Sequence, residues 1–194
     1  MVEALKYYRK QKFFNDFQIC FPENSKYVTI IHGDVWTNNF FVNSDETEVT
    51  FVDFQTLQTS HPARDFWYFI YTSTDSEWRK KHLEECFETY FETFSRYFTN
   101  ANISMTFGDF KKEFSSKRGF GVAWAMMVVP IMLNEDPEIN FSEVSGIKKM
   151  IKFRNEKFAE PMKETEEKYV KEINRRMLDV IEESYDLGIL RHRK

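Results

Sequence analysis

The sequence contains only two cysteines, and this scarcity excludes two classes of site. Cys20 and Cys86 are far apart in the chain. They cannot supply a disulfide framework, and neither belongs to a CxxC metal motif. We therefore interpret both as small hydrophobic residues of a protein from a reducing compartment, the cytoplasm.

An excess of basic charge is also missing. The chain has 27 Lys and Arg residues against 31 Asp and Glu, which gives a formal net charge of −4, and the two signs are interspersed. Such a surface provides no positive field to hold the phosphate backbone of DNA or RNA. We expect no nucleic acid among the partners of this protein.

Long apolar runs are absent as well. The longest uncharged run covers residues 119–134 and contains Pro130 and two glycines. It is shorter than the roughly 20 apolar residues that a membrane span requires. Charged side chains interrupt the first 20 residues, so no signal peptide is recognisable. We predict that 119–134 forms a buried helix and that the protein has no membrane span.

Aliphatic and aromatic residues, by contrast, are plentiful. Of the 194 residues, 42% are hydrophobic and 18% are aromatic, which is enough apolar surface for a sizeable core. No repeat, low-complexity tract or Gly/Ser linker divides the chain. We predict one unit over residues 1–194 with an α+β, mostly α fold, in which a short β-hairpin element precedes a helical bundle.

The first third of the chain predicts one helix and then strands. The apolar spacing over residues 4–17 is typical of an amphipathic helix. After it come three short β-rich runs, at residues 27–31, 39–42 and 48–52. Residues 43–45, Asn-Ser-Asp, predict a turn between the last two runs. We expect no other strand in the chain.

From Pro62 onward the pattern is helical. Pro62 suits a first helical turn, because its missing N–H has no intrahelical partner there, and this helix should carry residues 65–71. Thr74 and Glu77 have the spacing of a capping box for the next helix. The apolar stripe of that helix predicts an end near Asn100.

Two more helices are predicted in the second half of the chain. Asp109 can cap a helix that includes the apolar run 122–133, with a kink or an end at Pro130. The final helix is predicted to begin at Pro161, and its apolar stripe predicts a stop at Gly188. Its charged residues are interpreted as a solvated face.

The most informative stretch is HGDVWTNN, residues 32–39, which lies between two predicted strands. Asp53 ends the third strand. Two carboxylates and an amide at strand ends can converge on a hard divalent cation such as Mg²⁺. Asp34, Asn39 and Asp53 also follow the order of a phosphate-transfer loop, with an Asp, an Asn five positions later and a second Asp after a hairpin. In such loops the first Asp takes the proton of the attacking hydroxyl, and the other two hold the metal.

Some neighbouring residues keep alternative interpretations. Only the spacing selects Asn39 as a ligand, so a shift of register by one residue would replace it with Asn38. Trp36 could line a hydrophobic acceptor pocket or pack in the core, and we assign it no role. His61 is interpreted as a capping or packing residue rather than a ligand.

Three blocks of sequence, taken together, resemble a known family. They are HGDVWTNN, FVDFQ and HPARDFWYFI, in this order. The blocks are similar to the C-terminal lobe of the aminoglycoside phosphotransferase and choline kinase-like superfamily, which has a protein kinase-like fold. The closest similarity is to ecdysteroid kinase-like proteins, in which HGDxWxxN, DFQ and a downstream PxxD occur in this order. The resemblance extends from about Tyr27 nearly to the C-terminal end.

The resemblance implies a small-molecule kinase. Such an enzyme uses ATP and Mg²⁺ to phosphorylate an alcohol group, here of a steroid-like acceptor. The resemblance implies Asp34 as the catalytic base and Asn39 and Asp53 as magnesium ligands. It also implies that His32 braces the loop and that Asp65, on the following helix, is a buried acceptor that braces it too.

The sequence departs from the family pattern before the catalytic loop. A kinase of this kind carries there a lobe with a phosphate-covering loop and a strand lysine. Only 31 residues precede His32, and they contain no glycine. We therefore interpret residues 1–194 as the C-terminal lobe alone, with slow turnover and no nucleotide-binding residues assigned.

Two alternatives to an active kinase stay open. The first is a catalytically inactive lobe that binds an acceptor, or a protein partner through the surface left exposed. The second is a metal-dependent phosphohydrolase that uses the same carboxylates. The spacing from Asp to Asn favours the kinase over the phosphohydrolase.

Overall fold

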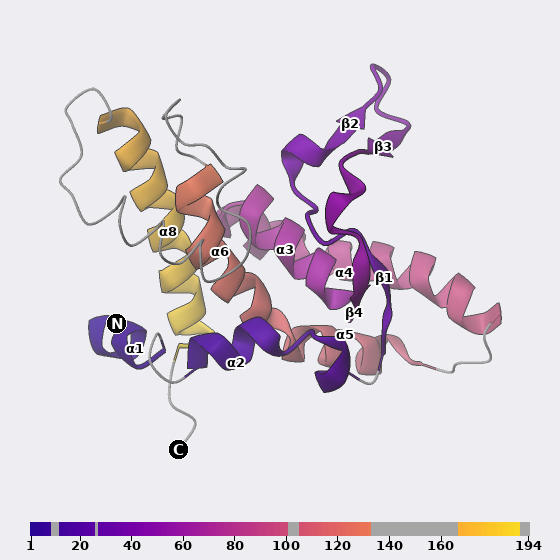
Figure 1. Ribbon diagram of the computed structural model, residues 1–194, viewed down its shortest axis with the longest axis horizontal. Coiled ribbons are helices and arrows are strands. Elements are labelled where there is room, and N and C mark those ends of the chain that lie inside the picture. Colours follow the sequence, from indigo (N-terminus) through magenta and orange to yellow (C-terminus); the bar gives the residue numbers. More distant parts are fainter. Residues whose placement is uncertain (9–11, 26, 101–104, 133–166, 191–194) are drawn as a thin grey trace.

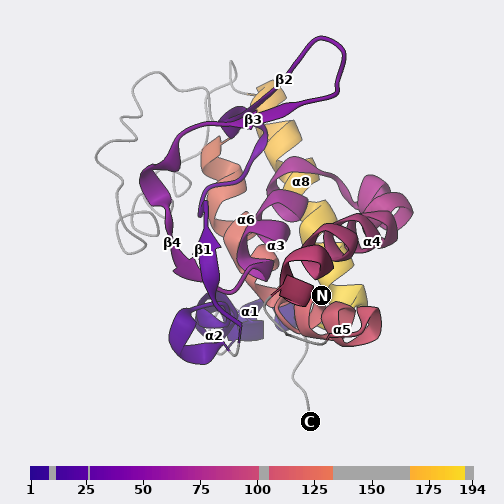
Figure 2. The same ribbon diagram turned by 90° about the vertical axis from the view of Figure 1, so that its right-hand side faces the viewer.

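The computed structural model describes residues 1–8, 12–25, 27–100, 105–132 and 167–190. These residues form an α+β fold that is mostly helical, as predicted (Figure 1). Two small antiparallel sheets, each of two strands, lie beside the helices. The sheet formed by β2 and β3, within residues 40–51, projects away from the helices in both views (Figures 1 and 2).

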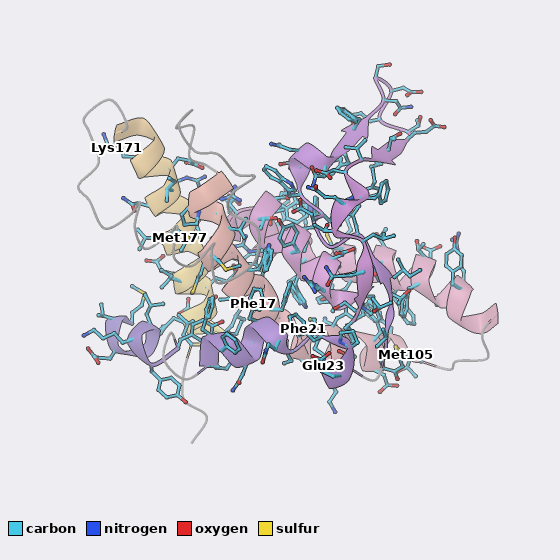
Figure 3. All side chains as sticks on the ribbon, viewed as in Figure 1. Phe17, Phe21, Glu23, Met105, Lys171 and Met177 are labelled. Carbon is cyan, nitrogen blue, oxygen red and sulfur yellow. The ribbon has the colours of Figure 1, made fainter. Side chains whose placement is uncertain are left out.

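The helix predicted over residues 4–17 corresponds to two short helices. They are α1, Val2–Tyr7, and α2, Phe13–Gln18, on either side of residues 9–11. Phe17 in α2 is labelled in Figure 3 and stacks on Trp124, with 5.0 Å between the ring centroids. This contact fixes the N-terminal segment to a helix that lies about 100 residues later in the chain.

The three predicted strands are present, but a fourth was missed. The strands are β1, Thr29–Ile31; β2, Phe40–Val42; β3, Val49–Phe51; and β4, Gln58–Ser60. β2 and β3 form the predicted hairpin, in which Oδ1 of Asn43 accepts the N–H groups of Thr47 and Glu48. β4 pairs with β1. The expectation of no other strand was wrong because the polar residues of β4 carry no strand pattern and pair only through the tertiary fold.

The helical part follows the predicted order with one extra break. The helices are α3, Ala63–Ser73; α4, Ser76–Asn100; α5, Phe107–Ser116; α6, Arg118–Met132; and α8, Glu167–Asp186. The segment predicted as one helix from Asp109 to residue 133 is divided at Lys117, whose ψ of −1° ends α5. α6 continues through Pro130. The predicted helix start at Pro161 lies outside the described residues, whereas Gly188 follows α8 with a φ of 73°.

Both predicted helix caps were wrong by a few residues. Asp75, not Thr74, caps α4, because its Oδ1 accepts the N–H of Trp78 at 2.8 Å. Thr106, not Asp109, caps α5, and its hydroxyl oxygen accepts the N–H of Asp109 at 3.1 Å. In both places two residues able to cap lie close together, so the sequence alone cannot select between them.

α6 is the central helix of the core and packs against α2, α3 and α8. Gly121 permits the close approach to α3, because a Cβ atom there would lie 2.7 Å from the main-chain oxygen of Trp67. The surrounding core is largely aromatic, and its fully buried members include Trp67, Tyr71, Phe110, Phe114 and Phe120. The run 119–134 is thus a buried helix as far as it is described. Within the described residues, no helix is both long and apolar enough to span a bilayer.

His61, just before α3, is completely buried. Its Nδ1 accepts the N–H of Ala63 at 3.0 Å, and its Nε2 lies 3.2 Å from Oε1 of Glu113. The interpretation as a capping and packing residue agrees with these contacts. Burial, helped by the positive charge of Lys117, lowers the pKa of His61 to about 4.

We expect this histidine to make the folded state sensitive to acid. An unfolded chain protonates His61 near pH 6.5, whereas the folded chain does so only near pH 4. The unfolded state therefore binds more protons between these values, and the free energy of unfolding should fall by roughly 3 kcal/mol as the pH drops through that window. Urea unfolding at several pH values between 7 and 4 measures this fall.

The matched variant for that measurement is His61→Asn. An asparagine side chain can still accept the N–H two residues ahead but does not titrate. The fall in stability should become smaller in His61→Asn, and His82→Asn, which replaces a partly exposed histidine of α4, is the control for the loss of a histidine elsewhere. Identical pH profiles for the wild type and His61→Asn would contradict the prediction.

Candidate active site

The loop that follows β1 begins with a turn that requires glycine. Gly33 has a φ of 85°, and a Cβ atom there would lie 2.5 Å from the carbonyl oxygen of Thr56. Both the left-handed backbone and the close approach exclude a side chain. The hydroxyl of Thr56 also donates to the carbonyl oxygen of His32 at 2.8 Å. The segment between β3 and β4 thus holds the start of the loop.

Asp65, in the first turn of α3, holds the same turn from the other side. Its two carboxylate oxygens accept the main-chain N–H groups of His32 and Gly33 at 2.8 and 2.9 Å. Burial raises the pKa of Asp65, while the two N–H donors oppose that rise. The loop is therefore attached to α3 through one carboxylate that accepts a pair of hydrogen bonds.

His32 connects the loop to the end of the hairpin. Its Nε2 lies 2.9 Å from the carbonyl oxygen of Val52, and its Nδ1 is 3.4 Å from the main-chain N of Asp34. Because a carbonyl oxygen can only accept, Nε2 carries the ring proton and donates it to Val52. The ring is buried and packs against Phe54, with 4.8 Å between the centroids.

Asp34 and Asn39 are joined directly. Nδ2 of Asn39 donates both to Oδ2 and to the main-chain oxygen of Asp34, each at 2.9 Å. Both N–H groups of the Asn39 side-chain amide are used in this arrangement, and its side-chain oxygen, Oδ1, can act as a ligand. Asn39 is buried, whereas its neighbour Asn38 is exposed. Trp36 packs against the main core.

Tyr68 also belongs to this cluster, although the sequence analysis did not single it out. Its hydroxyl donates to Oδ1 of Asp34 at 2.6 Å. Tyr68 follows Asp65 by three residues on α3, so the two side chains share one face of the helix. The spacing of Asp65 and Tyr68 can be read from the sequence. The contact between Tyr68 and Asp34 cannot, because it depends on the packing of α3 against the loop.

Asp53 is exposed and follows β3 at the end of the hairpin opposite its turn. It adopts a left-handed conformation with φ 64° and ψ 61°, which is uncommon for a residue other than glycine. The main-chain N–H of Val52 donates to the main-chain oxygen of Asn39, with 3.0 Å between the nitrogen and the oxygen. The residue next to Asp53 is therefore hydrogen bonded to the loop. Asp53 therefore lies at the same end of the sheet as the Asp34 and Asn39 pair.

Two carboxylates, those of Asp34 and Asp53, lie at this end of the hairpin, and the guanidinium of Arg64 lies near Asp65 and Tyr68 on the α3 side of the loop. The described ranges hold no group of three or more His, Cys, Asp or Glu side chains able to bind a metal. One exposed carboxylate and one amide oxygen are nevertheless the hard donors that Mg²⁺ accepts when phosphate oxygens and water complete its shell. The residues present fit a magnesium ion bound together with a phosphate ligand.

A comparison with known families also gives a match that covers this loop. The model of the ecdysteroid kinase-like family matches residues 3–103, which is more than half of the chain. The chain belongs to the ecdysteroid kinase-like family. The match begins before Tyr27, where the resemblance was expected to begin, and it ends at residue 103 rather than near the C-terminal end. It includes α1 from Glu3 onward, α2 to α4, both sheets and every residue of the loop described above. No curated protein and no solved structure matched the chain.

Membership of this family makes the chain a relative of small-molecule kinases, as the resemblance in sequence had implied. The roles of individual residues do not follow from membership alone. The geometry joins His32, Asp34 and Asn39 of the loop with Asp65 of α3 in one hydrogen-bonded network, and Asp53 lies at the neighbouring end of the hairpin.

Proposed function

We propose that this chain carries the catalytic loop of a magnesium-dependent phosphotransferase that moves the γ-phosphate of ATP to an alcohol group of a small molecule. The observation that carries the proposal is the Asp34 carboxylate, which is fixed by Asn39 on a loop held by Asp65. Family membership supports the reaction class, and its name supports an ecdysteroid, or another steroid-like alcohol, as the acceptor.

In this proposal Asp34 acts as the base. The acceptor oxygen forms a bond to the γ-phosphorus, its proton passes to the Asp34 carboxylate, and the bond from that phosphorus to the bridging oxygen of ADP breaks. Asp34 suits this role because it is only half buried, so a hydroxyl can approach it. Asp65 and His32 position the loop and do not touch the reacting atoms.

Asn39 and Asp53 are the proposed magnesium ligands. Magnesium bound there would neutralise negative charge on the transferred phosphate. The amide oxygen of Asn39 is directed by the two hydrogen bonds that its Nδ2 makes to Asp34. The left-handed backbone of Asp53 supports a functional role, because such conformations concentrate at binding sites.

A thermal-shift assay with ATP tests the ligand assignment. In the 194-residue chain, ATP with MgCl₂ should raise the Tm relative to ATP with EDTA, because binding at ten times Kd adds about 1.4 kcal/mol of stability. Asp53→Ala should abolish the magnesium-dependent part of this shift. Asp45→Ala is the matched control, since Asp45 is an exposed carboxylate in the turn of the same hairpin.

Transfer of labelled phosphate tests the base. With γ-³²P-labelled ATP and a panel of ecdysteroids, Asp34→Ala should lower the rate of transfer at least 100-fold, whereas Asp45→Ala should leave it unchanged. Unchanged transfer in Asp34→Ala would refute its role. Release of free phosphate with no product ester would favour a phosphohydrolase instead.

A second candidate function rests on the exposed apolar side chains of the two sheets. Eight large apolar residues between positions 28 and 57 are 44–67% exposed, namely Val28, Ile30, Phe41, Val42, Val49, Phe51, Phe54 and Leu57. Eight exposed large apolar side chains within 30 residues of the chain support a docking face on this part of the molecule. A lobe that binds a protein partner without transferring phosphate would show this face and no magnesium-dependent thermal shift.

A further inference from the structure

Helix α3 presents two different polar groups to the candidate catalytic loop. Asp65 accepts two main-chain N–H groups of the loop, and Tyr68, one helical turn later, donates to the carboxylate of Asp34 at 2.6 Å. The first contact fixes the backbone of the loop. The second reaches the side chain to which the proposed function assigns the proton transfer.

The Tyr68 side chain is held in this position by burial and by ring packing. It is only 3% exposed, and its ring packs against Trp124 of α6 with 5.4 Å between the centroids. Burial and the neighbouring charge of Asp34 raise the pKa of Tyr68 far above its usual value. The hydroxyl therefore keeps its proton at any physiological pH and can act only as a donor to the carboxylate.

The two oxygens of Asp34 consequently have different surroundings. Oδ1 accepts the Tyr68 hydroxyl, and Oδ2 accepts the amide of Asn39. A carboxylate held at both oxygens cannot rotate about its terminal bond without breaking one of these hydrogen bonds. Its remaining lone pairs thus keep a fixed direction toward an incoming hydroxyl.

We propose that Tyr68 is a positioning residue, which orients the Asp34 carboxylate for proton transfer from the acceptor. This inference rests on the proposed function, because it assigns Tyr68 a part in the same reaction. The hydroxyl of Tyr68 acts through Asp34 and touches neither the acceptor nor the phosphate. Its loss should reduce the rate of the chemical step more than it reduces substrate binding.

The test compares two buried tyrosines of the same helix. Tyr68→Phe removes only the hydroxyl that contacts Asp34. Tyr71→Phe is the matched control, because the Tyr71 hydroxyl is also buried and hydrogen bonded, but to Arg118 at 2.7 Å. Transfer from γ-³²P-labelled ATP to an ecdysteroid acceptor should show kcat lowered 10- to 100-fold in Tyr68→Phe, with KM for both substrates changed less than threefold. Tyr71→Phe should keep both constants within threefold of the wild type.

Proton NMR supplies a readout that does not depend on activity. A buried hydroxyl that donates to a carboxylate exchanges slowly and should give a resonance downfield of the amide region. This resonance should disappear in Tyr68→Phe, shift in Asp34→Asn and persist in Tyr71→Phe. If the chemical shift of the downfield resonance is the same in Asp34→Asn as in the wild type, the Tyr68 hydroxyl does not donate to Asp34 and the inference is wrong.

The outcomes separate the inference from the proposed function. A wild type that transfers phosphate, loses this activity in Asp34→Ala and keeps its full kcat in Tyr68→Phe would refute the positioning role alone. Equal losses of kcat in Tyr68→Phe and Tyr71→Phe would also refute it, because general loosening of α3 would then explain both. A wild type that transfers no phosphate to any acceptor would overturn the proposed function and the role of Tyr68 with it.

Discussion

Asp65→Asn should lower the free energy of unfolding by about 2–4 kcal/mol and slow phosphate transfer at least tenfold. The substitution keeps the size of the side chain but leaves it with a single accepting oxygen. One of the N–H groups of His32 and Gly33 would then face the new NH₂ group, donor against donor. Urea unfolding and the transfer assay measure the two effects.

Asp75→Asn is a matched control for this prediction. Asp75 accepts one N–H group, at the start of α4, and asparagine caps a helix about as well as aspartate does. The control should change stability by less than about 0.5 kcal/mol. If Asp65→Asn were equally mild, the loop would not depend on a carboxylate that accepts two hydrogen bonds, and the account of how α3 holds it would be wrong.

The sequence predicts the elements that have a strong local pattern. The hairpin of β2 and β3 has two short β-rich runs with Asn-Ser-Asp turn chemistry between them, and the apolar stripe of α4 predicts the helix end near Asn100 that the structure shows. β4 has neither pattern, because Gln58, Thr59 and Ser60 are polar, and its extended form comes from pairing with β1. Elements formed by tertiary pairing are therefore the ones that the sequence does not predict.

The candidate site shows the same division. Sequence order identifies Asp34 and Asn39 as members of one loop, and they are hydrogen bonded. The role of Thr56 in holding that loop has no local signal, because it depends on how the segment after β3 returns to β1. The spacing of Tyr68 from Asp65 predicts that both side chains share one face of the helix. The sequence does not predict that the Tyr68 hydroxyl contacts Asp34, because this contact depends on how α3 packs against the loop.

Glu183→Ala should be the most destabilising of the predicted substitutions, with a loss of about 3–5 kcal/mol. Glu183 in α8 pairs with two guanidinium groups, those of Arg79 in α4 and Arg118 in α6. Arg79 is 1% exposed. Removing the carboxylate would leave two positive charges close together with little solvent, next to the ring of Tyr71. Because α8 lies beyond the residues that match the family model, this network also ties the C-terminal helix to the matched part.

Two comparisons separate the cost of unpaired charge from the loss of attraction. Glu172→Ala, on the same helix, breaks a surface pair with Arg175 and should cost less than about 1 kcal/mol. Replacing the whole group, as Arg79→Met with Arg118→Leu and Glu183→Leu, should restore most of the stability that Glu183→Ala loses, since no buried charge is then unpaired. If the triple variant were as unstable as Glu183→Ala, the attraction within the network, rather than the cost of isolated charges, would be what holds α8 in place.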